Sequence, residues 1–420
     1  RTAYNAGVYT RPEESFTEHG DYNRHAEAIV TPALAAHTEA LARAVNLDGP
    51  RIAVFNSLPW SRDGVVETTL AGELPVALKD AATGAILPVE PASGKLRFIA
   101  RGVPSMGYRS YTPVSTATLE AAALTLNEAT RTIANAFFEV RMDPMRGCIA
   151  SIREKQTGRE LVNPNRTYGF AQYFRELYSQ EDIEGFKRSF YTRGGGGDTR
   201  TDLPPGPHQT AVARAMDLEF RRGPVSVSAI LSATPAEIPH GVAVAVTLFA
   251  GLPYVEITWS ITGKQKDPWP EAGWLALPFA VTKPSFHLGR LAAVSNLAKD
   301  IIPGSNHELY KLTNGMAVVD PDGNGAGLST LDAPLVSIEH TGGYRYSRDF
   351  LPTEPTVFVN LYNNLYGVNF AQWIGGEWSS RVRVWAVSGY QPGKAIVTPG
   401  RESRVPLEAG SATGAAGRLP

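Results

Sequence analysis

Side chains able to hydrogen-bond a sugar gather in four short stretches of this sequence. Sugars present hydroxyl rims and apolar C–H faces, so sites that bind them combine forked amides and carboxylates with flat aromatic rings. The same side chains also suit sheet cores and asparagine-rich turns, and composition alone leaves both interpretations open. The groups concerned are Tyr173, Arg175, Glu176 and Tyr178; Trp269, Glu271 and Trp274; Asn306, His307 and Tyr310; and Tyr362, Asn363, Asn364, Asn369 and Trp373.

Three carboxylates follow the first of these stretches, at Glu181, Asp182 and Glu184. A catalytic acid would need such a group beside a ligand cavity, whereas a short acidic run more commonly forms a solvated turn. We interpret the segment as a solvated turn and keep the catalytic acid as the alternative.

Metal-ligating residues are sparse. Of the eight histidines, only His19 and His25, with Asp21 between them, lie close enough in sequence to resemble a metal site. They stand ahead of a predicted helix, where capping and surface positions are commoner, so we expect no metal there.

A second acidic stretch imitates the opening of a calcium-binding loop. Asp320, Asp322 and Asn324 are followed by Gly325, but Leu331 stands where such a loop supplies a bidentate glutamate. We therefore predict a hairpin loop at this position.

Nucleophilic and phosphate chemistry find no support in the sequence. Cys148 is the only cysteine, which excludes an intrachain disulfide, and no histidine or helix signal nearby suggests an activated thiol. Gly194–Gly197 lacks the Lys-Ser/Thr pair and the helix of a phosphate-binding loop, so we interpret it as a flexible loop. No Gly-x-Ser-x-Gly segment occurs.

Charge and hydropathy exclude two further classes of partner. The 420 residues carry 40 Lys plus Arg and 41 Asp plus Glu without a run of like charges, so we expect no nucleic acid partner. The most apolar stretch, Val242–Val255, is interrupted by polar, glycine and proline residues and falls short of the ~18 residues of a membrane span. We expect no membrane partner. Both ends are expected to be cuts in a longer polypeptide, and the compartment stays unknown.

Helical spacing is confined to the start of the chain. Tyr22–Val30 and Pro32–Val45 are predicted as two helices that pack side by side, because a proline inside a helix breaks it. Thr31 supplies a capping hydroxyl ahead of Pro32. The apolar face of the second helix is formed by Leu34, Thr38, Leu41 and Val45.

After Arg51, short alternating runs separated by Gly, Pro, Asn and Asp are typical of antiparallel β-sandwiches. In Val255–Thr262 the apolar residues occupy one face of a strand and the polar residues the other. Phe138–Met142 and Cys148–Ile152 form a predicted hairpin, with a second turn at Lys155–Gly158. We thus predict a mainly β protein, with a small β domain and a large antiparallel sandwich behind a short N-terminal helical segment.

Three ordered segments carry a resemblance to a known enzyme family. Val54–Val66 is similar to a strand V-F-N-P-L-S-W-x-R-x-x-V-V. Phe138–Leu161 is similar to a hairpin followed by I-x-S-I-x-D-K-x-T-G-x-E-L, and Val359–Phe370 to a strand L-Y-N-N-x-W-x-T-N-F, with Tyr366 in place of Trp. In this order the segments resemble the β region of glycoside hydrolase family 38, the α-mannosidase family. Four further segments resemble a divergent, uncharacterised bacterial branch of that family: Glu14–His19, Tyr178–Asp182, Trp269–Trp274 and Gly304–His307.

The resemblance implies a retaining α-mannosidase built from a zinc-binding β/α barrel, a helical bundle and β-sandwiches, the largest akin to galactose mutarotase. In that family two His and two Asp hold the zinc, a barrel Asp is the nucleophile, and a second carboxyl acts as acid and then base. The barrel motif His-x-Asp-x-Gly-Trp does not occur here. The resemblance therefore implies Zn²⁺ in the complete enzyme, and we expect neither zinc nor catalytic residues in this chain.

On this resemblance, residues 1–48 are expected to form the end of the helical bundle, 49–115 the small β domain, and 116–420 a mutarotase-like supersandwich truncated at its C-terminus. The chain would bind carbohydrate and support a catalytic barrel domain that it lacks. Five side chains are expected to hydrogen-bond the sugar from the far wall of the site: Tyr178, Asp182, Asn306, His307 and Asn363.

A stand-alone carbohydrate-binding or mutarotase-like sandwich is the alternative function. A mutarotase needs a catalytic histidine and glutamate facing one sheet, and His340 with Glu308 or Glu339 provides the nearest candidates. A purely structural sandwich fits the composition but not the three ordered family segments.

Overall fold

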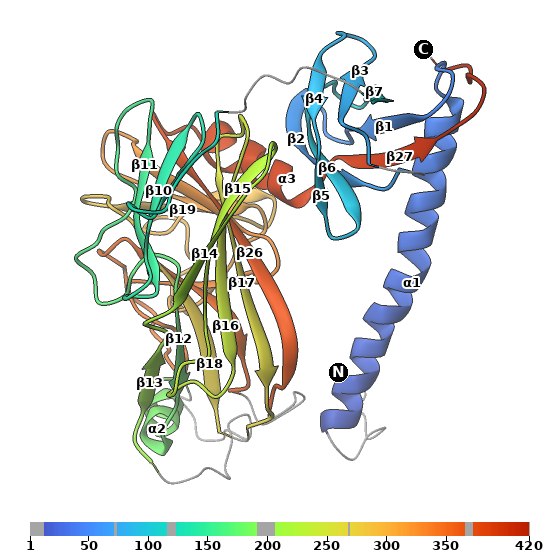
Figure 1. Ribbon diagram of the computed structural model, residues 1–420. Coiled ribbons are helices and arrows are strands. Elements are labelled where there is room, and N and C mark those ends of the chain that lie inside the picture. Colours follow the sequence, from blue (N-terminus) through green and yellow to red (C-terminus); the bar gives the residue numbers. More distant parts are fainter. Residues whose placement is uncertain are drawn as a thin grey trace.

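The computed structural model describes residues 12–70, 74–115, 123–190, 206–267, 269–365 and 373–419. A long helix stands beside two β bodies, a small one at the end of the helix and a large one made of stacked sheets (Figure 1). The strands of both bodies pair antiparallel. The predicted fold class, mainly antiparallel β with an N-terminal helical segment, is confirmed.

Helix α1 spans Pro12–Ala44 without a break, although Pro32 lies inside it. The expected separation into two helices is therefore wrong. A proline removes one backbone hydrogen bond, and the alanine-rich segment that follows Pro32 favours a helix strongly enough for α1 to continue. Only the C-terminal end of α1 packs on the small body, since Thr38 and Ala42 are buried whereas every residue from 21 to 37 is exposed (Figure 1).

Two sheets build the small body. The first has the order β27 (Glu408–Ala412), β1 (Arg51–Phe55), β7 (Tyr108–Val114), β3 (Ala77–Asp80) and β4 (Ile86–Pro88). The second has the order β2 (Arg62–Thr68), β6 (Lys95–Val103) and β5 (Glu90–Ala92). Strand β27 pairs with β1, so the end of the chain returns to this body and not to the large sandwich in which the sequence-based division had placed it.

Arg51 fastens the end of α1 to the small body. Its side chain is buried, and its Nε and Nη2 donate to the carbonyl oxygens of Ala42 and Arg43 at 2.8 and 2.9 Å. Carbonyl groups in the last turn of a helix lack partners within the helix, so this arginine caps α1 from the neighbouring strand.

Three sheets build the large body. The nine-stranded sheet has the order β14 (Asp217–Arg222), β15 (Ser226–Ala233), β16 (Gly241–Phe249), β17 (Val255–Lys264), β26 (Gly376–Val387), β23 (Gly325–Thr330), β22 (Gly315–Val319), β19 (Ser285–Arg290) and β20 (Ala293–Asn296). The six-stranded sheet has the order β13 (Gln209–Val212), β12 (Gln172–Leu177), β18 (Glu271–Pro278), β25 (Thr356–Asn363), β24 (Leu335–Ile338) and β21 (Tyr310–Lys311). The four-stranded sheet has the order β11 (Cys148–Glu154), β10 (Phe138–Asp143), β9 (Thr132–Ala134) and β8 (Thr125–Asn127).

The core of the large body lies between these sheets. In β17 the side chains of Val255, Ile257, Trp259 and Ile261 are buried and those between them are partly exposed, as the alternation predicted. All eight residues of β18 are buried, so the six-stranded sheet is covered on both faces along this strand. Burial of apolar surface on this scale, at ~25 cal/mol per Å², holds β12 and β18 rigid and fixes the positions of the residues at their ends.

The predicted hairpins are confirmed. Strands β10 and β11 pair around Asp143–Gly147. The 320–324 segment joins β22 to β23, and Asp320 Oδ1 accepts hydrogen bonds from the backbone N–H groups of Asp322 and Asn324 at 3.0 and 2.8 Å. This is the hairpin loop expected in place of a calcium loop.

Three short helical elements interrupt the β region: α2 (Gln180–Phe190), the π-helical turn η1 (Gly393–Val397) and α3 (Thr398–Arg404). The interpretation of Glu181, Asp182 and Glu184 as a solvated turn is therefore wrong, because all three lie in α2. Glu181 and Asp182 occupy its first turn, where acidic groups interact favourably with the positive end of the helix dipole. Gly194–Gly197 lies outside the described residues. Within the described ranges, no helix has the length and hydropathy needed to cross a membrane.

Candidate functional site

A cavity of about 760 Å³ lies at the end of β12, between α2 and the 341–345 segment. Its volume is within the range of small-molecule sites in proteins. The polar groups that converge on it come from β12, α2, the approach to β13, and the segment after β24. They are Glu176, Tyr178, Asp182, His208 and Thr341, with Arg188 and Arg345 also in the lining.

A helix cap positions Asp182. Ser179 N and Oγ each donate to Asp182 Oδ2 at 2.7 Å, and Asp182 N lies 3.2 Å from Ser179 Oγ. This reciprocal arrangement closes the first turn of α2 and holds the carboxylate at the cavity wall.

His208 stands between two carboxylates of the cavity. Its Nδ1 is 3.2 Å from Asp182 Oδ2, and its Nε2 is 3.9 Å from Glu176 Oε1. The hydrogen bond to Asp182 raises the pKa of His208 above its ordinary value of 6.5, against the opposing effect of burial. Burial favours a higher pKa for Asp182, but hydrogen bonds from His208 and Ser179 outweigh it and lower that pKa. The pair is thus charged around mildly acidic pH.

Glu176 and Tyr178 share one side of the chain because they are two residues apart where β12 ends. The Tyr178 hydroxyl donates to Glu176 Oε2 at 2.5 Å, and Thr341 Oγ1 donates to Glu176 Oε1 at 2.9 Å. Burial, followed by the neighbouring Glu176 carboxylate, raises the pKa of Tyr178 well above its ordinary value. The phenol therefore stays protonated and holds Glu176 in place.

Only glycine fits at position 343. A Cβ atom there would overlap the hydroxyl oxygen of Tyr178. The next residue, Tyr344, packs its ring edge-to-face on Tyr178 with 5.3 Å between ring centroids. The 341–345 segment therefore packs directly against the polar side chains at the end of β12.

The cavity offers both kinds of hydrogen-bonding group within a small volume. Carboxylates accept hydrogen bonds, while the His208 imidazole and the arginine side chains of the lining can donate. The positive charges of His208, Arg188 and Arg345 accompany the negative charges of three lining carboxylates, Glu176, Glu181 and Asp182. Because the charges of opposite sign balance, the site suits an uncharged molecule with several hydroxyl groups better than a strong ion.

Two of the five residues predicted to bind sugar lie together in this cavity, namely Tyr178 and Asp182. Asn306, His307 and Asn363 do not line it. Asn363 is half-buried at the end of β25, where its Nδ2 donates to Asn360 Oδ1 at 2.8 Å.

Asn306 and His307 lie outside the cavity and make hydrogen bonds with nearby backbone groups. Asn306 Oδ1 accepts a hydrogen bond from the Glu308 N–H at 3.1 Å. His307 N donates to Ser347 O at 2.8 Å, and His307 Nδ1 lies 2.9 Å from Phe350 O. These contacts hold the segment that continues from the cavity wall at residues 341–345.

Sequence reasoning did not select Glu176, His208 and Thr341 as site residues. Glu176 could have been found, because a strand that places Tyr178 in a site places the residue two before it on the same side. His208 and Thr341 lie far from β12 in the sequence, and no local pattern marks either one.

A second group of charges lies mostly buried inside the large body, with Asp267 at its partly exposed edge. Glu271 is fully buried, accepts a hydrogen bond from Lys264 Nζ at 2.5 Å and pairs with Arg175 Nε. Arg175 Nη2 lies 2.6 Å from Asp267 Oδ2. Since these charges neutralise one another in the interior, we assign the cluster a structural role.

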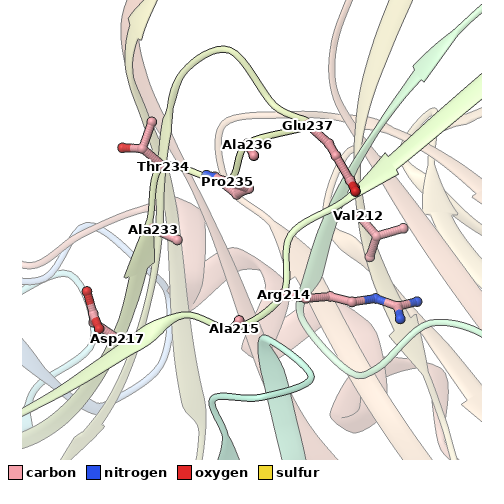
Figure 2. A pocket seen from close by; sticks show the side chains of 9 residues that line it. All are labelled: Val212, Arg214, Ala215, Asp217, Ala233, Thr234, Pro235, Ala236 and Glu237. Carbon is pink, nitrogen blue, oxygen red and sulfur yellow. The ribbon is translucent and has the colours of Figure 1, made fainter.

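Figure 2 shows another cavity, of about 470 Å³, beside β14 and β15. The Arg214 and Asp217 side chains extend toward opposite sides of it, and small residues form most of the wall between them. Polar groups do not converge there as they do at the end of β12, so this cavity is the weaker candidate.

Metal ligation and thiol chemistry find little support among the described side chains. In the part of the chain that the structure describes, no group of three or more His, Cys, Asp or Glu side chains could hold a metal ion. His19 and His25 both lie on the exposed part of α1. Burial raises the pKa of the Cys148 thiol to about 12, so it stays protonated and unreactive at neutral pH.

The histidine and glutamate considered for a mutarotase do meet. His340 Nε2 lies 2.5 Å from Glu308 Oε2, and the imidazole is partly exposed. Glu339 instead accepts hydrogen bonds from the N–H groups of Thr353 and Glu354 at 2.6 and 3.1 Å. The sequence-based alternative therefore reduces to the His340–Glu308 pair.

No protein-family model and no curated protein matches this sequence. Among solved structures, a glycosyl hydrolase family 38 protein from Enterococcus faecalis covers 97% of this chain and 53% of its own, with a TM-score of 0.64 and 12% identity. An α-mannosidase from Enterococcus faecalis V583 covers 90% of this chain and 47% of its own, with a TM-score of 0.60 and 12% identity. A putative aldose 1-epimerase from Escherichia coli K12 covers 61% of this chain and 97% of its own, with a TM-score of 0.34 and 12% identity. This chain thus spans about half the length of the first two structures and shares their fold.

Proposed function

We propose that this chain is the helix and β-sandwich part of an α-mannosidase-like glycoside hydrolase, and that its cavity at the end of β12 holds one side of the sugar. The observation that carries the proposal is the convergence of Glu176, Tyr178, Asp182 and His208 on one balanced, polar cavity. The shared fold with two longer Enterococcus structures supports the architecture, since nearly all of this chain aligns with about half of each.

Helix α1 provides the surface on which the remaining domain would pack. A helix of a folded protein buries its apolar residues, yet several on α1 are 42 to 70% exposed in this chain: Tyr22, Ile29, Val30, Leu34 and Leu41. A catalytic barrel domain seated along α1 would cover them. In this arrangement residues 1–48 complete a helical bundle and residues 49–420 form the β part.

The roles in such an enzyme divide between the two parts. The described residues do not offer a ligand set for zinc, so the Zn²⁺ ion and the nucleophile would reside in the barrel domain. This chain would contribute hydrogen bonds alone. Glu176, held by Tyr178 and Thr341, and Asp182, held by Ser179, are the acceptors that would meet the sugar hydroxyls.

The proposed sugar contact can be tested by following the His208 imidazole by NMR while methyl α-mannoside is titrated into the chain. We expect saturable shifts at His208, because it lies between the two carboxylates that would bind the hydroxyls. Glu176→Gln should weaken binding about tenfold through loss of a charged acceptor. Glu219→Gln, on an exposed pair with Arg221, is the matched control. Shifts absent from His208, or equal affinities for both variants, would contradict the proposal.

The His340–Glu308 pair supports a second candidate, a mutarotase-like sandwich that acts without another domain. A carboxylate can remove the proton of the anomeric hydroxyl while an imidazolium protonates the ring oxygen, so that the ring opens and can reclose on either face. Polarimetry of freshly dissolved glucose and galactose distinguishes the two candidates. Catalysed mutarotation that disappears in His340→Gln favours the second candidate, and rates equal to those of buffer favour the first.

A further inference from the structure

A cleft of about 630 Å³ lies where the small body, the large body and α3 meet, away from the end of β12. Figure 1 shows α3 between the two bodies. The cleft walls come from β2, the turn before β17, β26 and the C-terminal helical segment. Its charged lining is mostly basic, with Arg62, Arg381, Arg383, Lys394 and Arg404 facing two acids, Asp63 and Glu402.

Two of these arginines are neutralised from outside the cleft. Arg383 Nε lies 2.8 Å from Glu256 Oε2, and its guanidinium lies over the Tyr254 ring at 4.5 Å. Arg381 makes two hydrogen bonds of 2.9 Å to the Asp332 carboxylate. Neither residue adds net charge to the cleft.

The other three cations have no carboxylate in contact within the described part of the chain. Arg62 is buried and donates only to uncharged oxygens. Arg404 donates to the carbonyl oxygens of Thr330 and Leu331, and among the described residues its buried Nε has no partner. Lys394 is exposed at the cleft, and it forms no ion pair with any described residue.

The acids do not compensate these cations. Asp63 is already paired with Arg101 at 2.9 Å. Of the residues that the structure describes, Glu402 is therefore the one lining carboxylate left to offset the three cations, and its Oε1 accepts a hydrogen bond from Trp60 Nε1 at 2.7 Å. Burial raises the pKa of Glu402 and lowers the pKa of Arg62 from its ordinary value. The cleft therefore holds an excess of positive charge in a partly desolvated place, which is unfavourable without a counter-anion.

We propose that this cleft binds a small organic molecule carrying an oxyanion, with the oxyanion among Arg62, Arg404 and Lys394. Guanidinium forks match phosphate, sulfate and carboxylate oxygens, and the cleft is large enough for an organic group behind the anion. Tyr254 and Trp385 supply apolar surface for that group. The proposal is independent of the sugar contact at the end of β12.

Calorimetric titration of the full chain with inorganic phosphate, sulfate, glucose 6-phosphate and glucose tests the proposal. We expect the charged probes to bind at one site and glucose to leave this site empty. Lys394→Glu reverses a charge at the cleft and should weaken phosphate binding about tenfold. Lys299→Glu, at an exposed position that does not line the cleft, is the control and should leave affinity unchanged.

Ser403→Asp gives a second variant at the cleft, because it adds a negative charge to the lining on α3, beside Arg404, and leaves all three cations in place. It should weaken phosphate binding as Lys394→Glu does. Stronger binding of glucose 6-phosphate than of inorganic phosphate supports an organic ligand, and equal affinities support the oxyanion contact alone. Absence of binding by every charged probe overturns the proposal, as does phosphate affinity that neither cleft variant changes.

Discussion

The His208–Asp182 pair links the stability of the cavity to pH. The pKa of His208 is raised in the folded protein, so its stabilising contribution is complete below the unfolded value of 6.5 and is lost as pH rises through the raised pKa. The pKa of Asp182 is lowered, so its contribution is present above the unfolded value of 3.8 and is lost as pH falls through the lowered pKa. The pair therefore stabilises the fold most between those two limits.

His208→Gln should remove this dependence. At pH ~5.5 the variant should lose about 0.5 kcal/mol of unfolding free energy, since both side chains are partly exposed, and at pH ~8.5 the loss should approach zero. Urea denaturation of both proteins at the two pH values measures the difference. An equal loss at both values would show that the pair does not act through charge.

Gly343→Ala should destabilise the chain by about 1–3 kcal/mol, because the added methyl group collides with the Tyr178 hydroxyl. Gly393→Ala is the matched control, since a Cβ at that position meets nothing within 4 Å. A Cβ at position 343 would also lie 2.5 Å from the Cζ atom of the Tyr178 ring, so in a Tyr178→Ala background, where the ring is gone, Gly343→Ala should cost less. Denaturant midpoints measure all four variants, and a cost unchanged by Tyr178→Ala would contradict the close approach.

At the residue scale, two of the five residues predicted to bind sugar, Tyr178 and Asp182, line one cavity, and their sugar contact stays a prediction. Tyr178 and Asp182 lie within one short segment, so their chemistry and proximity could be recognised from the chain alone. His208 and Thr341 join them through tertiary packing of the segments before β13 and after β24, which no local pattern describes. Asn306 and Asn363 have side chains suited to sugars, but the structure uses their amides in contacts with neighbouring residues.

At the scale of elements, the alternation of apolar and polar residues predicted the strands well. Individual residue types predicted less well where the helices begin and end. The buried face of β17 followed from period-two spacing. Helix α2 was missed although Ser179 and Asp182 have the spacing of a capping box, because its aromatic and charged neighbours suggested a turn. The continuity of α1 through Pro32 was missed because local rules treat an interior proline as a break.

The buried cluster between β12, β17 and β18 should be sensitive to single changes. Glu271→Gln would leave Lys264 and Arg175 without their shared buried carboxylate, and we expect a loss of about 3–5 kcal/mol. Glu219→Gln removes an exposed carboxylate and should cost less than about 1 kcal/mol. Chemical denaturation compares the two variants. Similar small losses for both would mean that the cluster does not hold the sheets together.

At the scale of the whole molecule, the mainly β architecture could be predicted because turn residues punctuate the alternating runs throughout. The return of β27 to pair with β1 could not, since that pairing joins opposite ends of the chain and no local pattern marks it. Two further observations concern the whole molecule. The apolar residues of α1 are exposed, and the chain covers only about half of each of two longer structures. Both support the proposal that this chain works with a further domain.

Hydrolysis of an aryl α-mannoside tests this division of roles most directly, when measured side by side for the 420-residue chain and for a gene product extended upstream of Arg1. The account predicts no hydrolysis by the chain alone, zinc-dependent hydrolysis by the longer protein, and about a tenfold lower kcat/KM for its Glu176→Gln variant. Hydrolysis by the 420-residue chain, or full activity of the Glu176→Gln variant, would contradict it.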